Sequence, residues 1–533
     1  MRRSRPAWRR LAAAGGALSL AAACAGAGAC TGGGEKGGTL RVLAGSELAD
    51  LKPILDQAKK DIGITVKLDY AGTLAGVQQV LDGTASRGHD AIWFSSNRYL
   101  ALHPRAQSRL GPSVKIMSSP VRLGVRASVA RRLGWDRTRP TWSAIAAATA
   151  AGKFSYGMTN PVSSNSGFSA LVGVAAAISG TGAALDGPTI SRVAPRLRGF
   201  FAAQRMTSGS SGWLSDTYAA DPGRTDGLIN YESVLLTLNA SHRLPEPLTL
   251  VYPADGVVTA DYPLTRLASA SGPSADALRG LTDYLRRPAV QRQIMARTHR
   301  RPVVPQVRPS AEFGAQPPEL PFPGRADAAD ALIDAYFNRL RRPARTVYVL
   351  DVSGSMRGAR LAALKAALTA LTGADTSLSG RFQRFHDREE VTLLPFSSRP
   401  GRPDTYVVPP ASSSAELTKI RDSAQALTAG GSTAIYESLE TAYSVIGGKP
   451  DDRITSIVLM SDGESNQGAT AADFRDWYEH RPIALRRVPV FPILFGESVT
   501  REMNGLATLT HGKVFDARLQ SLSAVFGEIR GYQ

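Results

Sequence analysis

Residues 346–356 read Thr-Val-Tyr-Val-Leu-Asp-Val-Ser-Gly-Ser-Met. The apolar run up to Leu350 predicts a strand that is buried on both faces, as in a parallel sheet covered by helices. Asp351, Ser353 and Ser355 follow at alternate positions, so one carboxylate and two hydroxyls come just past the end of this strand. Small, hard cations prefer oxygen ligands of this kind. The segment therefore predicts a metal site at the end of a buried strand.

Two later segments carry matching residues. Residues 427–436, Leu-Thr-Ala-Gly-Gly-Ser-Thr-Ala-Ile-Tyr, place a hydroxyl at an expected helix start after a glycine turn, and residues 457–464, Ile-Val-Leu-Met-Ser-Asp-Gly-Glu, end a second apolar strand in Asp462. Asp and Ser after strands commonly cap helices, and Asp-Gly is an ordinary turn, so each segment alone is weak. Capping does not readily explain all three in this order, which favours the metal site.

The three segments resemble the metal-ion-dependent adhesion site of the von Willebrand factor type A (VWA) family, Asp-x-Ser-x-Ser followed by Thr and then Asp. The resemblance implies a doubly wound, Rossmann-like α/β domain. It also implies that Mg²⁺ or Mn²⁺ is held, directly or through water, with one position open for a carboxylate of a protein partner. The implied ligands are Asp351, Ser353, Ser355, Thr433 and Asp462. Ser432 is adjacent to Thr433, but the family's Thr-Ala-apolar pattern favours Thr433.

The composition limits the class of protein. A chain of 533 residues with 43% hydrophobic and 20% charged residues is typical of a globular protein, and its length suggests about three compact units. The net charge of +18 comes mostly from arginines spread along the chain. Because no basic stretch with interleaved aromatic residues and no nucleic-acid module is present, we expect no nucleic-acid partner.

The N-terminus is typical of an export signal. Five arginines within the first ten residues precede an apolar run from Leu11 to Ala23, which is short for a membrane span. Ala-Ala-Ala-Cys24 and Ala-Gly-Ala-Cys30 each resemble a bacterial lipobox. Cys24 lies at the usual distance from the apolar run and Cys30 is followed by Thr-Gly-Gly-Gly, so either one is a candidate for lipidation. A disulfide between them would close a very short loop and stabilise little. We expect a protein anchored by lipid to the extracytoplasmic face of the cell membrane.

The segment between the signal and the predicted metal domain has βαβ organisation. Strands are expected at 39–44, 64–70 and 90–94, residues 119–126 look like a crossing between two lobes, and a strand at 154–160 runs into Pro-Val-Ser-Ser-Asn-Ser-Gly and a small-residue helix from Phe168. Over roughly residues 38–320 these features resemble the type 2 periplasmic binding fold, the bilobal extracellular solute-binding proteins of ABC importers. The likeness is nearest to those that take up molybdate-like or other small solutes.

Such a fold implies a cleft between its lobes. A cleft ligand would meet the loops after strands and the exposed N–H groups of helix starts, where anions and polar groups are favoured. The candidate ligand-binding residues are Ser46, Ser95, Ser96, Ser163, Ser164, Asn165, Ser166 and Tyr231. For each serine singly, helix capping is the more common role at such positions.

The predicted organisation has five parts. They are a lipoprotein signal peptide and lipobox at 1–30, a Gly-rich tether at 31–38, a solute-binding-like domain at 39–323, a linker helix at 324–344 and a VWA domain at 345–533. Apolar residues at helical spacing between Ala326 and Arg342 indicate a helix whose stripe serves packing.

The motifs favour a binding protein over an enzyme. The sequence has no Gly-x-Ser-x-Gly elbow, no His-Glu-x-x-His pair and no Walker-type phosphate loop. The leading interpretation is a cell-surface lipoprotein that binds a protein partner through Mg²⁺ and holds or senses a small solute. The alternative is a solute receptor of an ABC importer whose VWA domain docks an envelope partner. A third interpretation, an assembly factor that works with ATPases in metal insertion, conflicts with the export signal.

Overall fold

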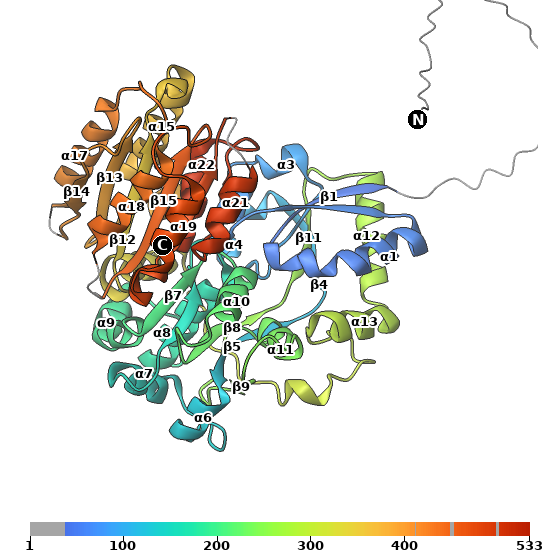
Figure 1. Cartoon of the computed structure of the whole chain (residues 1–533). Coiled ribbons are helices and arrows are strands. Elements are labelled where there is room, and N and C mark those ends of the chain that lie inside the picture. The colour runs from blue at the N-terminus through green and yellow to red at the C-terminus, as the bar shows by residue number, and fades with distance from the viewer. Residues whose placement is uncertain (1–37, 411, 448–451, 497–499) are drawn as a thin grey trace, which may run out of the picture. The chain divides into compact units, whose positions relative to one another are not determined.

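The computed structural model describes residues 38–410, 412–447, 452–496 and 500–533. The predicted signal, the candidate lipidation sites Cys24 and Cys30, and the tether up to residue 37 lie outside the described residues. The described residues belong to one compact unit, where the chain length suggested about three (Figure 1). Within the described part of the chain, no helix has both the length and the apolar character that crossing a membrane requires.

The first lobe is built on a mixed sheet whose strands run in the order β2-β1-β3-β11-β4. β1 pairs in parallel with β2 and β3, whereas β11 is antiparallel to β3 and β4. The strands are β1 (Thr39–Ala44), β2 (Thr65–Tyr70), β3 (Ala91–Trp93), β4 (Leu110–Lys115) and β11 (Pro263–Leu267). The helices are η1 (Ser46–Leu51), α1 (Lys52–Ile62), α2 (Thr73–Leu81), α3 (Ala85–Gly88), α4 (Arg98–Ala101), α5 (Pro104–Gln107), α12 (Pro273–Leu285) and α13 (Pro288–Thr298).

The second lobe has its own sheet, in the order β10-β5-β8-β6-β7, with β9 paired to β5. The chain enters this lobe after β4 and leaves it before β11, so two segments cross between the lobes. The strands are β5 (Ser119–Arg126), β6 (Tyr156–Thr159), β7 (Gln204–Ser208), β8 (Gly227–Tyr231), β9 (Leu248–Val251) and β10 (Thr259–Ala260). The helices are α6 (Ala127–Leu133), α7 (Trp142–Ala150), α8 (Asn165–Ser179), α9 (Gly187–Phe201), α10 (Ser211–Ala220) and α11 (Glu232–Ala240).

The expected linker helix ends at Leu340, two residues before the predicted end at Arg342. After the short helix η2 (Ala311–Phe313), α14 (Ala326–Ala335) continues as the π-helix η3 (Tyr336–Leu340), and Arg341 is already extended. Pro343 disfavours helix in the residue before it, which is one reason for the early end. The apolar stripe packs into the core of the bilobal part, and the Tyr336 hydroxyl donates to Gln204 Oε1 of β7 at 2.9 Å.

The C-terminal part is a six-stranded sheet in the order β14-β13-β12-β15-β16-β17, parallel except for β14. Its strands are β12 (Ala344–Asp351), β13 (Glu390–Phe396), β14 (Asp404–Val407), β15 (Ile454–Ser461), β16 (Val490–Leu494) and β17 (Phe515–Asp516). Its helices are η4 (Gly354–Met356), α15 (Ala359–Thr369), the π-helix η5 (Ala370–Ala374), α16 (Leu378–Gln383), α17 (Ser413–Ala426), α18 (Ile435–Ile446), α19 (Ala471–Glu479), α20 (Ile483–Arg486), α21 (Thr500–Leu509), α22 (Leu522–Ile529) and η6 (Arg530–Tyr532).

Helices cover both faces of this sheet (Figure 1). Successive residues of a strand point to opposite faces, and β12 shows the consequence: Val347 and Val349 pack under α18, α19 and α21, while Tyr348 and Leu350 pack under α15, α17 and α22. The whole run is therefore apolar, as the sequence predicted. The predicted α/β class, a bilobal periplasmic-binding fold followed by a doubly wound domain, is confirmed.

Candidate functional site

Three loops meet at the carboxyl edge of the C-terminal sheet. Two backbone hydrogen bonds, from Gly354 N to Gly431 O at 2.9 Å and from Gly430 N to Val352 O at 2.8 Å, join the loop after β12 to the loop before α18. Gly431 has a φ of 87°, and an added Cβ would lie 2.7 Å from the Ser398 hydroxyl, so the turn requires glycine. The loop after β15 is joined to the loop before α18, because Asn466 Oδ1 accepts a hydrogen bond from Thr433 N at 2.9 Å.

Four of the five predicted metal ligands form one chain of contacts at this edge. Asp351 Oδ1 accepts from the backbone N–H of Ser353 at 2.8 Å, and the hydroxyls of Ser353 and Ser355 lie 3.0 Å apart. The Ser355 hydroxyl then donates to Asp462 Oδ1 at 2.7 Å. Asp351 and Asp462 are buried, whereas Ser355 is exposed, so the group opens to solvent on the serine side.

Thr433 lies in the neighbouring loop but is not linked to this chain. Its side chain is buried, and no hydrogen bond joins its hydroxyl to the other four candidates within the described residues. Thr433 also precedes the helix that it was expected to begin, since α18 starts at Ile435. The structure thus brings Asp351, Ser353, Ser355 and Asp462 together and places Thr433 beside them.

Two residues of this site were missed at the level of sequence. The Ser461 hydroxyl donates to Asp351 Oδ2 at 2.6 Å, and the Arg360 guanidinium lies 2.5 Å from Asp462 Oδ2. Ser461 directly precedes Asp462, so its position next to the motif was a usable signal. Arg360 is in the first turn of α15, and the sequence does not indicate which carboxylate it would reach.

Burial controls the charge of the site. Removal from water raises the pKa of the Asp351 carboxyl, and the nearby Asp462 charge raises it further, while hydrogen bonds from Ser461 and Ser353 oppose the increase. Two like charges at a buried strand end are unfavourable without a cation between or beside them. Arg360 supplies such a cation to Asp462, and no described cation does so for Asp351.

The donor set fits a hard divalent cation. Among the described residues, no three or more His, Cys, Asp or Glu side chains group to hold a metal, so a metal here depends on two carboxylates and the serine hydroxyls. Oxygen-only donors suit Mg²⁺ and Mn²⁺ and are poor ligands for softer metals. A bound ion would hold Asp351 and Asp462 in one place and could accept a further oxygen ligand from solvent or a partner.

The cleft between the lobes is closed to a very small cavity. Its volume is about 20 Å³, which is room for about one water molecule, and six of the eight predicted cleft residues line it. These are Ser46, Ser95, Ser96, Ser163, Ser164 and Asn165. Tyr231 is buried behind Asn165, whose amide donates to its hydroxyl at 3.1 Å.

Ser166 does not face the cleft. It is fully buried, and its hydroxyl lies 2.7 Å from Thr159 Oγ1 and 2.8 Å from Ser211 Oγ inside the second lobe. The reason is the close approach of α8 to β6, since an added Cβ on Gly167 would lie 2.1 Å from the Thr159 carbonyl oxygen. The helix start thus directs Ser166 inward.

A carboxyl group that the sequence did not nominate lies in the cleft. The Ser95 hydroxyl donates to Glu47, and burial raises the pKa of Glu47 against the opposing effects of this bond and of Arg300. Arg300 is itself paired with Asp50, whose two carboxylate oxygens lie 2.7 and 2.8 Å from Arg300 Nη1. Glu47 therefore makes the cleft less favourable for an anion than the helix starts alone would suggest.

The backbone of the two lobes is joined directly across the cleft. Thr73 N donates to Ser163 O at 3.1 Å and Leu74 N donates to Val162 O at 3.0 Å. These N–H groups belong to the first turn of α2, the place where an anionic ligand would be favoured. They are already satisfied by carbonyl groups of the second lobe, so this end of α2 is not available to a ligand in the closed state.

Comparisons with known proteins agree with these two parts. Residues 40–297 match the family model for bacterial extracellular solute-binding proteins, and residues 346–464 match that for the von Willebrand factor type A domain. No curated protein matches the chain.

Among solved structures, the periplasmic binding protein AfuA from Actinobacillus pleuropneumoniae, with exogenous fructose-6-phosphate bound, is 11% identical with a TM-score of 0.45, covering 56% of this chain and 98% of its own. The sulfate-binding protein SubI from Mycobacterium tuberculosis H37Rv is 18% identical with a TM-score of 0.41, covering 55% and 98%. A von Willebrand factor type A protein from Catenulispora acidiphila is 19% identical with a TM-score of 0.29, covering 36% and 42%.

Proposed function

We propose that this chain, which joins a bacterial extracellular solute-binding domain to a VWA domain, is a lipid-anchored receptor on the extracytoplasmic face of the cell membrane. Its VWA domain binds a carboxylate of a protein partner through Mg²⁺, and its bilobal domain holds a small solute. The observation that carries the metal-dependent part is the hydrogen-bonded chain Asp351, Ser353, Ser355 and Asp462 at a sheet edge.

The partner side of this proposal follows from the chemistry of the donor set. Asp351 and Asp462 are buried, while Ser355 and the loop around it face solvent. An Mg²⁺ ion bound by these residues keeps coordination positions on the solvent side, which water or an oxygen ligand from a partner can take. A carboxylate is the ligand of a protein partner that best balances the charge of such an ion.

The test is a Mg²⁺ titration of the full chain, followed by thermal unfolding and calorimetry. A ligand that binds only the folded state adds about 2.7 kcal/mol at a hundredfold excess over its Kd. Asp351→Ala should abolish this gain and EDTA should reverse it, whereas Asp422→Ala, at an exposed position on α17, should leave it unchanged. Arg360→Gln should bind Mg²⁺ more tightly than wild type, because Arg360 competes for Asp462. A wild-type protein that shows no Mg²⁺ binding heat and no shift in melting temperature would contradict the proposed metal site.

The lipid anchor is proposed from the export signal and its two lipobox-like cysteines. Replacing both Cys24 and Cys30 by Ser should release the protein from the membrane fraction, since a mature chain without the lipid keeps no anchor of that kind. Membrane fractionation followed by immunoblotting measures the release. Single Cys24→Ser and Cys30→Ser variants serve as controls and identify the modified residue. A double variant that stays with the membrane as wild type does would exclude the anchor.

A further inference from the structure

A second, much larger cavity lies at the mouth of the closed cleft. Its volume is about 560 Å³, within the range of small-molecule sites, and it shares Ser46, Ala71 and Ser163 with the inner cavity. Its walls come from three parts of the chain: α2 and β2 of the first lobe, the loops after β6 and β7 of the second lobe, and η5, α16 and α22 of the VWA domain.

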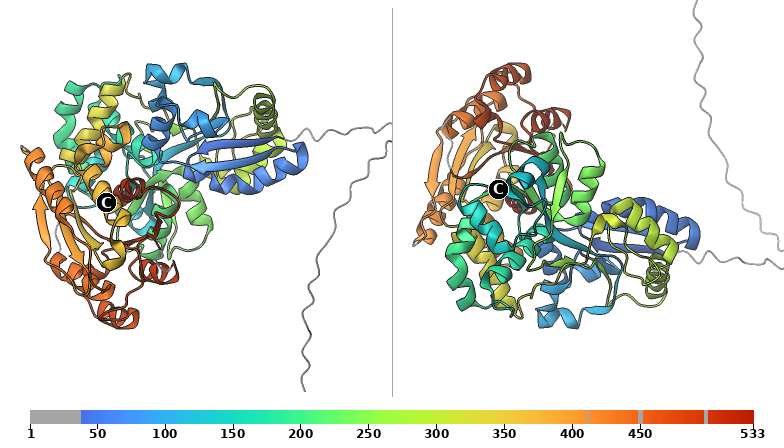
Figure 2. Two further views of the ribbon diagram at one scale, coloured as in Figure 1. Left: turned by 90° about the horizontal axis from the view of Figure 1, so that it is seen from above. Right: turned by 90° about the horizontal axis from the view of Figure 1, so that it is seen from below.

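The VWA domain touches both lobes at the edges of this cavity. On the first lobe, Leu378 N of α16 donates to Gln78 Oε1 of α2 at 2.8 Å. On the second lobe, Asn160 Nδ2 donates to Arg530 O at 3.3 Å, and Gly531 packs against Ser163. Figure 2 shows the C-terminal end of the chain beside the green segments of the second lobe in both views. The VWA domain therefore covers the cleft mouth and forms one side of the cavity.

The inner cleft offers little room for a solute in this state. Its volume of about 20 Å³ accommodates one water molecule, and the first turn of α2 is bonded to carbonyl groups of the second lobe. The covered cavity at the mouth is the larger space that still contacts both lobes. A solute there would touch the same cleft serines, Ser46 and Ser163, from the outer side.

The side chains of this cavity that have no hydrogen-bond partner are uncharged. Within the described residues, the side-chain amides of Gln79 and Gln383 and the hydroxyls of Ser46, Ser163 and Ser523 line the cavity without a hydrogen-bond partner. Amides and hydroxyls both donate and accept, so together they match a ligand that carries several hydroxyl groups.

Each charged group in the wall has at least one partner. Lys513 Nζ lies 3.0 Å from Glu528 Oε1 and 2.7 Å from the Tyr532 hydroxyl. Asp375 accepts from the backbone N–H of Ser377 at 3.0 Å. One cation and two carboxylates give the wall no excess of positive charge, which disfavours an anion such as sulfate.

We infer that this junction cavity is the solute site of the protein and that it takes an uncharged, polyhydroxylated molecule of the size of a small saccharide, with the VWA domain supplying part of the binding wall. The inference rests on the proposed solute-binding function and adds the place of binding and the class of solute. Because α16 and α22 form the wall, solute and VWA domain stabilise each other's position against the lobes.

The experiment uses the full chain with four named probes: glucose, trehalose, sulfate and spermidine. Binding is measured by isothermal titration calorimetry and by the shift in melting temperature at millimolar probe. Ala524→Trp fills the cavity from α22, and Ala415→Trp places the same side chain on exposed α17 away from the cavity. Glucose or trehalose should bind wild type and the Ala415→Trp control, and Ala524→Trp should weaken that binding by about tenfold or more.

Two smaller changes keep the test valid if the tryptophan variant does not fold. Gln79→Ala on α2 and Gln383→Ala on α16 should each weaken the same binding by about tenfold, because each removes a hydrogen-bonding amide from an opposite wall. A loss with Gln383→Ala is specific to this site, since Gln383 does not line the inner cleft cavity.

The outcomes separate this inference from the proposed function. Saccharide binding that ignores Ala524→Trp and Gln383→Ala but is lost with Asn165→Ala would overturn the junction site and leave a solute receptor with an inner-cleft site. Binding of sulfate or spermidine in place of either saccharide would overturn the class of solute. No binding of any of the four probes would overturn this inference and remove support for solute binding, while the Mg²⁺ titration would still test the metal site independently.

Discussion

The imidazole of His386 is held without contact with water. The side chain is 1% exposed and stacks on the Phe337 ring, with 4.4 Å between the ring centroids. Its Nε2 lies 3.0 Å from the Phe382 carbonyl oxygen. Since a carbonyl only accepts, Nε2 carries the proton and Nδ1 is left without a partner. Burial lowers the pKa of His386 to about 3, with the Arg530 and Arg341 charges adding to the shift and Glu389 opposing it. The folded protein therefore keeps His386 neutral.

This neutral histidine makes stability fall at acid pH. The unfolded chain takes up a proton near pH 6.5 and the folded chain only near pH 3, so the free energy of unfolding decreases as the pH falls through this window. His386 contributes about 1.4 kcal/mol per pH unit to the slope. His386→Gln should remove this contribution, and exposed His480→Gln should not. Denaturant unfolding across the window measures both; equal slopes for wild type and His386→Gln would contradict the argument.

At the scale of single residues, the sequence predicted which residues lie at the site better than it predicted which side chains they contact. Asp351, Ser353, Ser355 and Asp462 could be predicted because each ends a strand or follows it directly, and strand ends of a parallel sheet meet at one edge. Arg360 and Glu47 could not, since their partners Asp462 and Ser95 are distant in the chain. The prediction that Ser166 lines the cleft was wrong for a similar reason. The packing of α8 on β6 decides which way a serine at the start of the helix points.

At the scale of elements, η6 depends on a residue without a side chain. A Cβ on Gly531 would lie 2.3 Å from Ser163 Oγ, 2.8 Å from Ser163 Cβ and 3.2 Å from Gly209 Cα. Gly531→Ala should therefore cost about 1–3 kcal/mol of stability through overpacking between the VWA domain and the second lobe. Equilibrium unfolding in denaturant measures this cost.

The matched control is Gly505→Ala on α21, where an added Cβ meets nothing within 4 Å. There the substitution should stabilise the protein by about 0.5–1 kcal/mol, because alanine is a better helix former than glycine. Two substitutions of one kind with opposite signs would show that the contact, and not the loss of glycine, is responsible. A stabilising Gly531→Ala would mean that η6 does not pack against the second lobe.

The strands were the elements best predicted from sequence. The expected strand at 39–44 coincides with β1, and the expected strands at 64–70, 90–94 and 154–160 contain β2, β3 and β6. Residues 119–126, expected as a crossing between the lobes, instead form β5 within the sheet of the second lobe. Helix ends were less well defined. α8 begins at Asn165, before Phe168, and the linker changes to a π-helix at Tyr336. At the second position the Tyr336 hydroxyl bonds to Gln204 of β7, a tertiary contact that local sequence does not contain.

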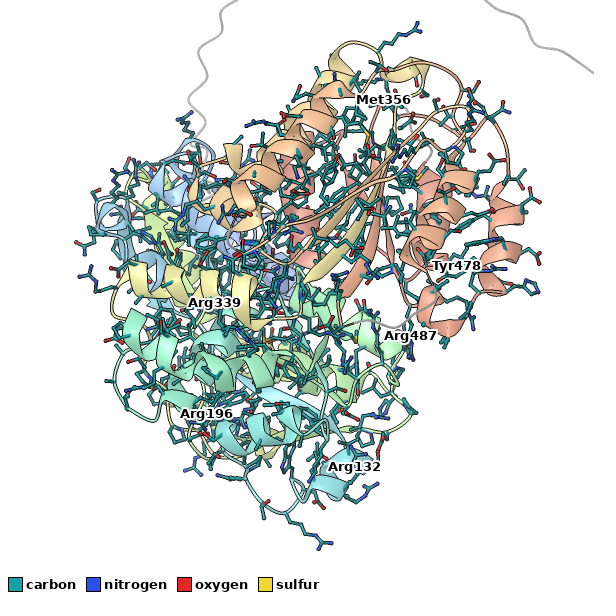
Figure 3. All side chains as sticks on the ribbon, turned by 90° about the vertical axis from the view of Figure 1, so that its left-hand side faces the viewer. Arg132, Arg196, Arg339, Met356, Tyr478 and Arg487 are labelled. Atoms are coloured by element: carbon teal, nitrogen blue, oxygen red, sulfur yellow. The ribbon has the colours of Figure 1, made fainter. Side chains whose placement is uncertain are left out.

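At the scale of the whole molecule, the two domains exchange side chains. Phe382 of α16 belongs to the core of the bilobal part, and Trp213 of α10 packs against the VWA core, 5.1 Å from the Tyr532 ring and 6.3 Å from the Phe491 ring. Arg487, labelled in Figure 3, adds an ion pair to Asp221 at 2.8 Å. Because that pair is partly exposed, it contributes at most about 1 kcal/mol, and the apolar contacts carry the junction.

A domain that shares its core with its neighbour should not unfold alone. Differential scanning calorimetry of the wild-type chain is therefore expected to show one transition, although chains with several domains often show more than one. Trp213→Ala removes the aromatic contact with Tyr532 and Phe491 and should divide the heat absorption into two transitions. Trp477→Ala is the matched control, since the ring contacts of Trp477 among the described residues are with Phe474 and Tyr443 of the VWA domain. This change should lower the single transition without dividing it. Two transitions in the wild-type protein would show that the domains are energetically separate, and the junction cavity would then lack the rigid wall that solute binding there requires.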